Sequence, residues 1–163
     1  MHARYLLDLQ TYMEGRKLLA DNRKARYNYT VTDTLECGIA LKGTEVKSLR
    51  SGKFSFTDAY GRIKNNELWL VGFHITPYEF GNINNHLPER ERRLLAHKDE
   101  IKRLKRKVDE RGFTLIPMKF YLKGGLVKVE LGICQGKKMH DKRQSIKERD
   151  EKRQADRDIR QRF

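Results

Sequence analysis

The last 28 residues of the chain, 136–163, constrain the fold most strongly, because they offer almost nothing to a hydrophobic core. They read GKKMHDKRQSIKERDEKRQADRDIRQRF, with eleven Lys or Arg and six Asp or Glu. The only sizeable apolar residues are Met139, Ile146, Ile159 and Phe163. So few apolar groups do not offset the entropy of ordering the segment in isolation. The core must therefore be built from the residues that precede this tail.

The charges of the tail nevertheless favour a helix, since pairs such as Lys147/Glu151 and Glu148/Lys152 are spaced i,i+4. We expect a tail that is disordered in the free protein and forms a basic helix on a polyanion. In a chain of net charge +14, nucleic acid is the polyanion that fits best. A solvated charged tail without a partner is the alternative that the segment alone leaves open.

The apolar runs lie in residues 21–135, a length sufficient to close one core without staples. Cys37 and Cys134 are the only cysteines, and their spacing suggests no metal site, so we expect two free thiols, no metal and no cofactor. No apolar stretch approaches the roughly 18 residues that span a bilayer. The N-terminus lacks the features of a secretion signal. These observations favour a soluble, cytoplasmic protein.

The first 17 residues differ in character from the rest and are expected to be an N-terminal extension. They could contain a short amphipathic helix with Tyr5, Leu6, Leu9 and Met13 on one face. Alternatively, the chain could start at Met13, with residues 1–12 read from an upstream start codon. Residues 16–26, RKLLADNRKAR, predict a helix with a basic C-terminal half that leads into the body.

The first part of the body predicts a strand followed by a short helix. Residues 27–42 alternate with β-branched and aromatic side chains, which is typical of a strand. Gly38 within this run suggests a bulge or a bend. A helix is expected over residues 45–50, with Thr44 as its N-cap and Gly52 at its end.

The remainder of the body predicts two pairs of strands with a long helix between them. The strands are residues 56–63 and 68–76 around a turn at 64–66, then residues 113–123 and 126–133 around Gly124–Gly125. Residues 68–76 are the most apolar of these and are expected to be central. After a loop over 77–86, Pro88 fits the first turn of a helix over 89–111, which Gly112 ends.

This order of elements predicts a small antiparallel β-barrel with flanking α-helices and a basic C-terminal tail, and the OB-fold is the obvious candidate. Barrels of this kind often bind nucleic acid. A fold does not by itself establish a function, however, so the residues have to be considered individually.

Several stretches resemble one known family in their order and spacing. They are NRKARYNY (22–29), GTEVKSLRSGK (43–53), LWLVGFHITPYEFGN (68–82), RERRLLAHKDEI (90–101) and, above all, GKKMHDKRQSIKERD (136–150). The chain is similar here to the small protein B (SmpB) family, the bacterial partner of transfer-messenger RNA. The resemblance runs from about residue 18 to residue 150.

The resemblance implies an OB-type core, residues 18–135, that binds the tRNA-like domain of transfer-messenger RNA at its elbow. It also implies that the tail, residues 136–163, occupies the empty decoding centre and mRNA channel of a stalled ribosome. Such a protein is an adaptor for trans-translation and ribosome rescue on non-stop mRNA. It has no catalytic residues, and we expect a monomer with one copy per RNA.

Particular residues match the motifs of the family. Glu36, Leu95 and His97 match its RNA-contact positions. In the tail, the family has a run GKK–x–x–DKR that is needed for ribosomal function. The matching residues here, with the histidine that precedes the aspartate, are Gly136, Lys137, Lys138, His140, Asp141, Lys142 and Arg143. A histidine in such a basic run can stack on a nucleobase.

Physical chemistry supports an RNA-binding role for the body. Five cations could line a phosphate-tracking surface: Arg23, Lys24, Arg26, Lys47 and Arg50. A carboxylate on such a surface repels phosphate but accepts from base N–H groups, so Glu36 suits base reading. Leu94 and Leu95 are adjacent, so only one can point fully into the core, and Leu95 is then available to pack against a base or ribose.

Two other classes of protein fit parts of the sequence. A structural ribosomal protein would also be small and basic, with a barrel and a tail. A nuclease could use a metal held by carboxylates such as Glu36 and Asp58. Against the enzyme, the sequence has no Gly-rich phosphate loop and no nucleophile beside a base.

Overall fold

The computed structural model describes residues 15–162, so the helix considered around residues 5–13 lies outside the described residues. The helices are α2 (Arg23–Asn28), α3 (Gly43–Arg50), α4 (Lys98–Arg111) and α5 (Met139–Arg162), with a 3-10 turn, η1, at Asn82–Asn84. The strands are β1 (Arg16–Asp21), β2 (Tyr29–Ile39), β3 (Phe54–Ser55), β4 (Tyr60–Lys64), β5 (Glu67–Val71), β6 (His74–Ile75), β7 (Arg92–Leu95), β8 (Thr114–Lys123) and β9 (Leu126–Gly136).

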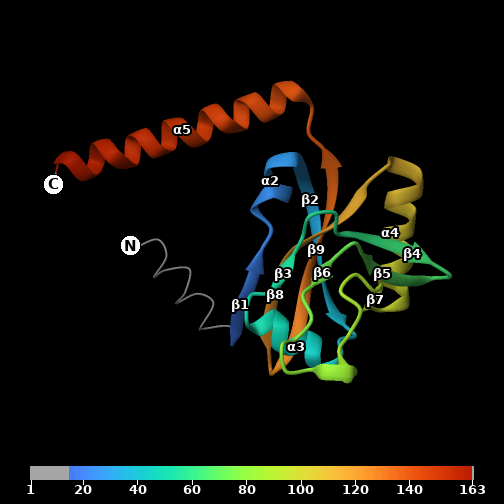
Figure 1. Cartoon of the computed structure of the whole chain (residues 1–163). Coiled ribbons are helices and arrows are strands. Elements are labelled where there is room, and N and C mark those ends of the chain that lie inside the picture. Colours follow the sequence, from blue (N-terminus) through green and yellow to red (C-terminus); the bar gives the residue numbers. More distant parts are fainter. Residues whose placement is uncertain (1–14, 163) are drawn as a thin grey trace.

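An antiparallel sheet forms the body of the protein (Figure 1). Its strand order is β1-β8-β4-β5-β7-β2-β9, and β9 also pairs with β8. Each of the strands β8, β4, β5, β7, β2 and β9 therefore has a partner on both sides. The short strands β3 and β6 pair separately. The prediction of an antiparallel, sheet-rich fold with flanking helices is confirmed.

The core lies between the inward faces of these strands. Its centre is a stack of Phe73 on Phe120, with ring centroids 4.6 Å apart, and both side chains are fully buried. Leu68 and Leu70 of β5 point into it, as the period-2 alternation of a strand requires. The central position expected for this apolar strand is confirmed, since β5 lies between β4 and β7.

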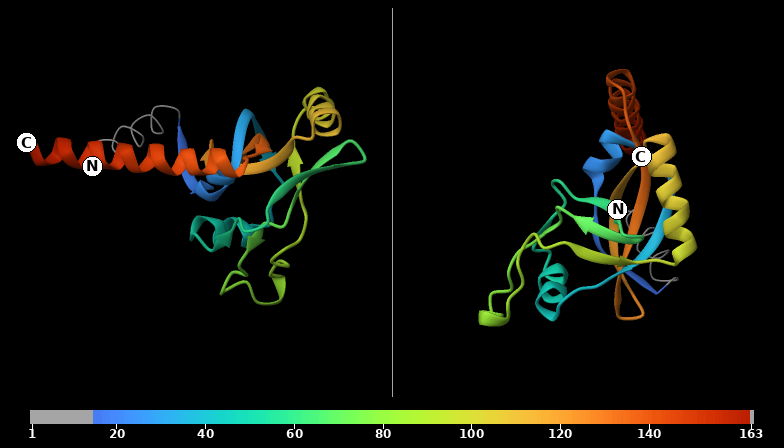
Figure 2. Two further views of the ribbon diagram at one scale, coloured as in Figure 1. Left: turned by 90° about the horizontal axis from the view of Figure 1, so that it is seen from above. Right: turned by 90° about the vertical axis from the view of Figure 1, so that its right-hand side faces the viewer.

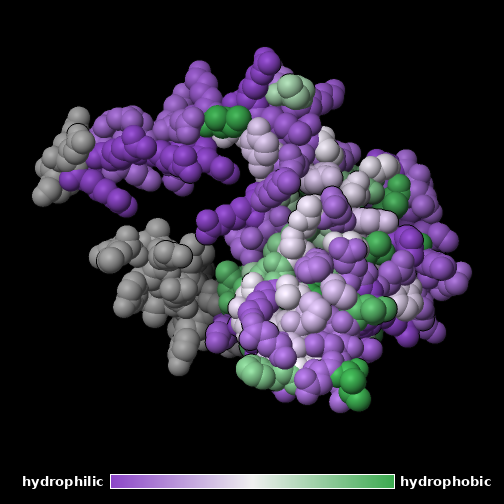
Figure 3. Space-filling model, viewed as in Figure 1, coloured by the Kyte–Doolittle hydropathy of each residue, from purple (hydrophilic) through white to green (hydrophobic). Residues whose placement is uncertain are grey.

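The helices are distributed around the sheet (Figures 1 and 2). Helix α4 lies along one side and buries Ile101 and Leu104 against the core. Helices α2 and α3 lie at opposite ends of the body, both in Figure 1 and in the right-hand view of Figure 2. Helix α5 projects away from the body, and its surface in Figure 3 is almost wholly hydrophilic.

The prediction of a helix over residues 16–26 is wrong for its first half. Residues 16–21 form β1, which pairs antiparallel with β8, and only α2 is helical. The sequence RKLLAD has good helix propensity, but propensity is a weak preference that tertiary pairing overrides. Residues 119–123 of β8 offer backbone hydrogen-bond partners to residues 16–21, and this pairing stabilises the strand over an isolated helix.

The prediction of one helix over residues 89–111 is also wrong. Residues 92–95 form β7, and α4 begins only at Lys98. Burial alternates along β7, with Arg92 and Leu94 inside and Arg93 and Leu95 outside. A pattern of apolar residues alone does not show this alternation, because one of the two inward side chains is the charged Arg92.

Smaller differences concern the ends of elements. Thr44 does not cap α3, which starts at Gly43, and its hydroxyl instead lies 2.9 Å from Nδ1 of His86. The predicted strand over 68–76 is interrupted by Gly72, whose φ of +70° favours glycine. The predicted strand over 56–63 is likewise shorter, because β4 begins at Tyr60.

Other local predictions are confirmed. The hairpin of β8 and β9 turns at Gly124–Gly125, and β4 and β5 turn at Asn65–Asn66, both with positive φ. Gly112 ends α4 in the left-handed conformation. Gly38 lies where β2 passes from pairing with β9 to pairing with β7, which fits the expected bend.

Candidate nucleic-acid interface

Glu36 lies on the outer face of β2 in a network of side chains from three strands. Its carboxylate accepts a hydrogen bond from the Tyr121 hydroxyl and one of 3.0 Å from Nζ of Lys123, both on β8. A guanidinium nitrogen of Arg16 on β1 lies 3.5 Å away. The Arg16 guanidinium also lies over the Tyr121 ring, 5.2 Å from its centroid.

These contacts fix the charge of the network. The hydrogen bond from Tyr121, with that from Lys123, holds the pKa of Glu36 below its ordinary value in spite of partial burial. Burial and the neighbouring carboxylate raise the pKa of Tyr121, so its hydroxyl stays protonated as a donor. About a third of the Glu36 side chain stays exposed, at 33%. A carboxylate has room for further donors beyond these partners, so Glu36 can still accept from a ligand.

Leu95 shares this face with Glu36. Gly38 is two residues after Glu36 on β2 and pairs directly with Leu95 on β7, so all three side-chain positions point the same way. Leu95 is 52% exposed, whereas its neighbour Leu94 is 1% exposed. The expectation that only one of the two leucines points inward is confirmed, although on a strand and not on a helix.

The structure places His97 two residues after Leu95, where it is exposed and directly precedes α4. Its backbone N–H donates to the carboxylate of Glu100 at 2.8 Å, which fixes the start of the helix. Of the residues matched to RNA-contact positions, Glu36 and Leu95 therefore share one face of the sheet, and His97 follows two residues after Leu95.

Sequence reasoning missed the partners of Glu36, which are Arg16, Tyr121 and Lys123. They lie 20 residues or more from it along the chain, and only the register of β1, β8, β9 and β2 brings them together. No local motif marks such a set. The excess of charged and aromatic residues on an outward strand face is the one signal that was available.

The five cations proposed as one phosphate-tracking surface do not lie together. Arg23, Lys24 and Arg26 belong to α2, and Lys47 and Arg50 to α3, at opposite ends of the body (Figure 1). Arg26 pairs with Asp21 at 2.9 Å, and Lys47 lies over the Tyr78 ring. The five cations therefore form two separate groups.

The tail leaves the body next to α2. The backbone N–H of Lys137 donates to the carbonyl oxygen of Asn28 at 2.9 Å. Its Nζ donates to the carbonyl oxygen of Arg26 and to Oγ of Ser145, each at 3.1 Å. Lys137 therefore ties the first turns of α5 to the end of α2.

The other matched tail residues are differently placed. Gly136 ends β9, while Lys138, His140, Asp141 and Arg143 are exposed and Lys142 is partly buried. His140 lies 3.9 Å from the carboxylate of Asp141. Except for Lys137, the lysines and arginine of this run make no side-chain hydrogen bond within residues 15–162 and are open to a polyanion.

A buried ion cluster holds β7 in place. The carboxylate of Glu45 on α3 accepts from Arg90 at 2.6 and 2.8 Å and from Arg92 at 2.8 Å. Glu45 and Arg92 are fully buried. Burial opposes ionisation of Glu45, but hydrogen bonds from Arg90, the Lys42 backbone and Arg92 outweigh it and lower the pKa of its carboxyl.

The carboxylates and cysteines of the described residues do not gather into a metal centre. Residues 15–162 contain no cluster of three His, Cys, Asp or Glu side chains able to hold a metal ion. Glu36 faces the network around Tyr121, whereas Asp58 lines a groove beside α2. Cys37 and Cys134 are free and buried, and burial raises the pKa of Cys37 to about 12 and that of Cys134 to about 11. Among the described helices, none is both long and apolar enough to span a bilayer.

Comparison with known proteins decides the family. The model of the SmpB protein family matches residues 19–161. The chain belongs to the SmpB family. It is 58% identical over 143 residues to an SsrA-binding protein of Treponema denticola, covering 88% of this chain and 93% of that one. It is 52% identical to an SsrA-binding protein of Trichodesmium erythraeum, with 91% and 96% covered.

A solved structure is also similar to this SmpB-family chain. It is described as "tmRNA-SmpB: a journey to the center of the bacterial ribosome", and the matching chain is 50% identical. The TM-score is 0.63, with 74% of this chain and 85% of that chain covered. The likeness therefore extends through most of the body described above.

Proposed function

We propose that this protein is an RNA-binding adaptor for trans-translation. It binds the tRNA-like domain of transfer-messenger RNA, delivers that RNA to stalled ribosomes and places its C-terminal tail in the empty decoding centre and mRNA channel. The observation that carries this proposal is the family match, which spans residues 19–161 and so includes both the body and the basic tail. Relatives named SsrA-binding proteins and a tmRNA–SmpB structure support it.

The two halves of the function belong to two surfaces. The body, residues 18–135, recognises RNA through Glu36, Leu95 and His97, with phosphate contacts from the cations of α2 and α3. The tail, residues 136–163, acts on the ribosome, where the length beyond the turns tied by Lys137 passes from a disordered free state to a helix. Its net charge of +5 suits a channel lined by ribosomal RNA.

Glu36 gives the body its selectivity in this proposal. A basic surface attracts any RNA, because phosphate contacts carry no sequence information. A carboxylate accepts from amino and imino groups of unpaired bases, which a structured RNA elbow exposes. The Tyr121 and Lys123 donors hold the Glu36 carboxylate in one orientation, so it is positioned before RNA arrives.

We also propose a more specific fold and setting. The ring of pairings through β8, β4, β5, β7, β2 and β9 supports an OB-type closed barrel. The protein has no reaction of its own, acts as a monomer with one copy per RNA, and works in the cytoplasm, where ribosomes translate.

Truncation after Gly136 tests the division between the surfaces. The truncated body should bind the tRNA-like domain with nearly unchanged affinity, but peptide tagging on ribosomes stalled on non-stop mRNA should be abolished. Full-length protein serves as the control in both assays. Equal losses of RNA affinity and tagging would show that the two surfaces are not separate.

A further inference from the structure

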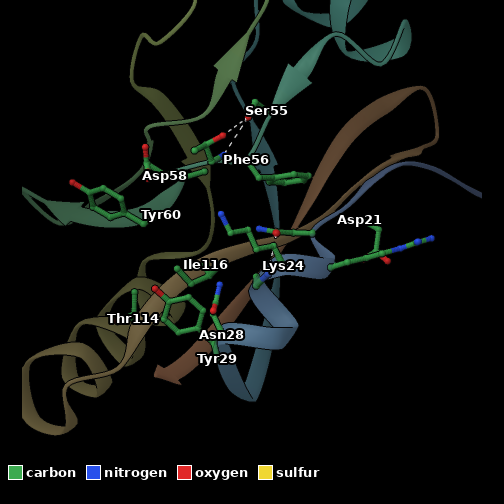
Figure 4. Close-up of a pocket in the computed structure, with 15 residues that line it drawn as sticks. Asp21, Lys24, Asn28, Tyr29, Ser55, Phe56, Asp58, Tyr60, Thr114 and Ile116 are labelled. Atoms are coloured by element: carbon green, nitrogen blue, oxygen red, sulfur yellow. Dashed lines mark hydrogen bonds between the residues drawn. The ribbon is translucent and has the colours of Figure 1, made fainter. Parts of the chain in front are cut away.

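Of the residues that line a groove beside α2, the function proposed so far uses only the cations Arg23 and Lys24. It has a volume of about 790 Å³ and lies between α2 and the segment that joins β3 to β4. Figure 4 shows Ser55, Phe56, Asp58 and Tyr60 on one side of it, and Lys24, Asn28 and Tyr29 on the other. Thr114 and Ile116 of β8 also line it. Ligand sites in proteins occupy roughly 300–1,000 Å³, so the size suits a bound group.

The wall formed by residues 55–60 is supported by hydrogen bonds and ring packing. Oγ of Ser55 and Oγ1 of Thr57 are hydrogen-bonded at 2.5 Å, and the Ala59 N–H donates to the carbonyl oxygen of Phe56 at 2.9 Å. The Phe56 ring packs against Phe73 and Phe120. Side chains and backbone together therefore hold this wall in one conformation.

Gly72 lets the same segment approach the sheet. A Cβ atom at Gly72 would lie 2.5 Å from the carbonyl oxygen of Asp58, which no side chain tolerates. The close approach seats Asp58 and its neighbours at the rim of the groove.

The opposite wall is equally fixed, through Asn22. Its backbone N–H donates to the carbonyl oxygen of Met118 at 2.8 Å, and its side-chain amide donates to that of Pro117 at 3.0 Å. The Asn22 oxygen also accepts from the N–H of Ala25 at 3.1 Å. Since both walls are held by the protein itself, a ligand would bind without the entropy of ordering them.

The chemistry of the groove fits single-stranded RNA. Arg23 and Lys24 are exposed, and their side chains make no hydrogen bond or ion pair within residues 15–162, so they are available to phosphate. Ser55, Thr57 and Thr114 offer hydroxyl groups to base edges and ribose. Tyr60 is 39% exposed and offers a ring face, and unpaired bases stack on such faces.

We propose that this groove holds a short unpaired segment of RNA, with its phosphates at Arg23 and Lys24 and one base stacked on Tyr60. The proposal rests on the RNA-binding function given above and adds a second contact site, separate from the network around Glu36. The unpaired segment can come from transfer-messenger RNA or from ribosomal RNA, since the chemistry is the same.

Cross-linking from the groove distinguishes these sources. The photoreactive residue p-benzoylphenylalanine is placed at position 57 of the full chain, and at position 65, in the β4–β5 turn, as the control. Each protein is irradiated with the tRNA-like domain and, separately, with purified ribosomes. Cross-links to either RNA from position 57 in clear excess over position 65 support the groove and identify the source.

Affinity measurements on the full chain provide the second test. Tyr60→Ala should weaken binding to the cross-linked RNA at least about five-fold, the lower end of what one lost base stack produces. Tyr60→Phe should stay near the parent, because it keeps the ring. Lys24→Gln should weaken binding more than Lys64→Gln, which removes the same charge at the end of β4.

The outcomes separate this inference from the proposed function. The proposal that the groove binds RNA is overturned if position 57 gives no excess cross-linking and both Tyr60→Ala and Lys24→Gln keep the parental affinity. The adaptor role is tested separately, by the Glu36 variants. Equal affinity of the parent for transfer-messenger RNA and ordinary tRNA contradicts the adaptor role instead. Thermal unfolding of Tyr60→Ala beside Tyr60→Phe shows whether a loss reflects misfolding.

Discussion

Nζ of Lys137 donates a hydrogen bond of 3.1 Å to the carbonyl oxygen of Arg26, the last basic residue of α2. A cation is favourable at this point, since the C-terminal carbonyls of a helix are partly negative and lack internal partners. The same ammonium group reaches Oγ of Ser145 in α5. One side chain therefore sets the direction in which the tail leaves the body.

Replacing Lys137 should loosen the tail. Lys137→Met keeps the length of the side chain but removes the donor, so spin labels at positions 102 and 144, the second of them in the turns that Lys137 ties to α2, should give a broader distance distribution. Lys138→Met removes a neighbouring exposed lysine with the same charge change and should leave the distribution as in the parent. Identical distributions for the two variants would contradict an orienting role for Lys137.

Glu36→Ala should weaken binding to transfer-messenger RNA while leaving nonspecific, salt-sensitive RNA binding little changed. A lost hydrogen bond to a charged group corresponds to about 1.5–3 kcal/mol, or roughly a ten- to hundred-fold change in affinity. Filter binding with the tRNA-like domain and with an unrelated RNA measures both effects.

The matched control for Glu36→Ala is Glu110→Ala, which removes an exposed carboxylate at the end of α4. It should not reduce the affinity for either RNA. A uniform loss across all RNAs with Glu36→Ala would argue against base reading.

Glu45→Gln should destabilise the fold by roughly 3–5 kcal/mol at neutral pH, because it leaves the buried Arg92 without its anionic partner. Urea unfolding measures the difference. Glu110→Gln, an exposed change of the same charge, should alter stability little. An unfolding free energy for Glu45→Gln equal to that of the parent would show that the cluster is not coupled to folding.

The same carboxyl predicts a dependence of stability on pH. Its pKa in the folded protein lies below the ordinary value of 4.5, so the unfolded chain binds the proton more readily. Glu45 therefore stabilises the fold above pH 4.5, and this contribution is lost as the pH falls through the lower, folded pKa. The unfolding free energy of the parent should fall more steeply there than that of Glu45→Gln.

Local signals predicted part of the fold from the sequence. The glycine pair at 124–125, the Asn65–Asn66 turn and Gly112 each specify a backbone conformation through their own chemistry, and those predictions hold. The prediction of a helix was wrong where contacts with residues distant in the sequence stabilise a strand instead. Residues 16–21 need the edge of β8, and Arg92 is tolerated inside only because Glu45 lies opposite.

The candidate site shows the same limit. The motif positions Glu36, Leu95 and His97 could be selected from the sequence through the family resemblance, and the register of β2 and β7 brings the first two to one face. Their surroundings could not, because Arg16 and Tyr121 meet Glu36 only through pairings across the sheet. The role of Lys137 as a link to α2 was hidden for the same reason.

The most direct test of the account is the affinity of the full chain for transfer-messenger RNA and for an ordinary tRNA, titrated across salt. The account predicts a large preference for transfer-messenger RNA that persists at high salt, because base contacts are screened less than phosphate contacts. Equal affinities with the same steep salt dependence would mean that the net charge of +14 alone drives binding, and would favour a structural ribosomal protein instead.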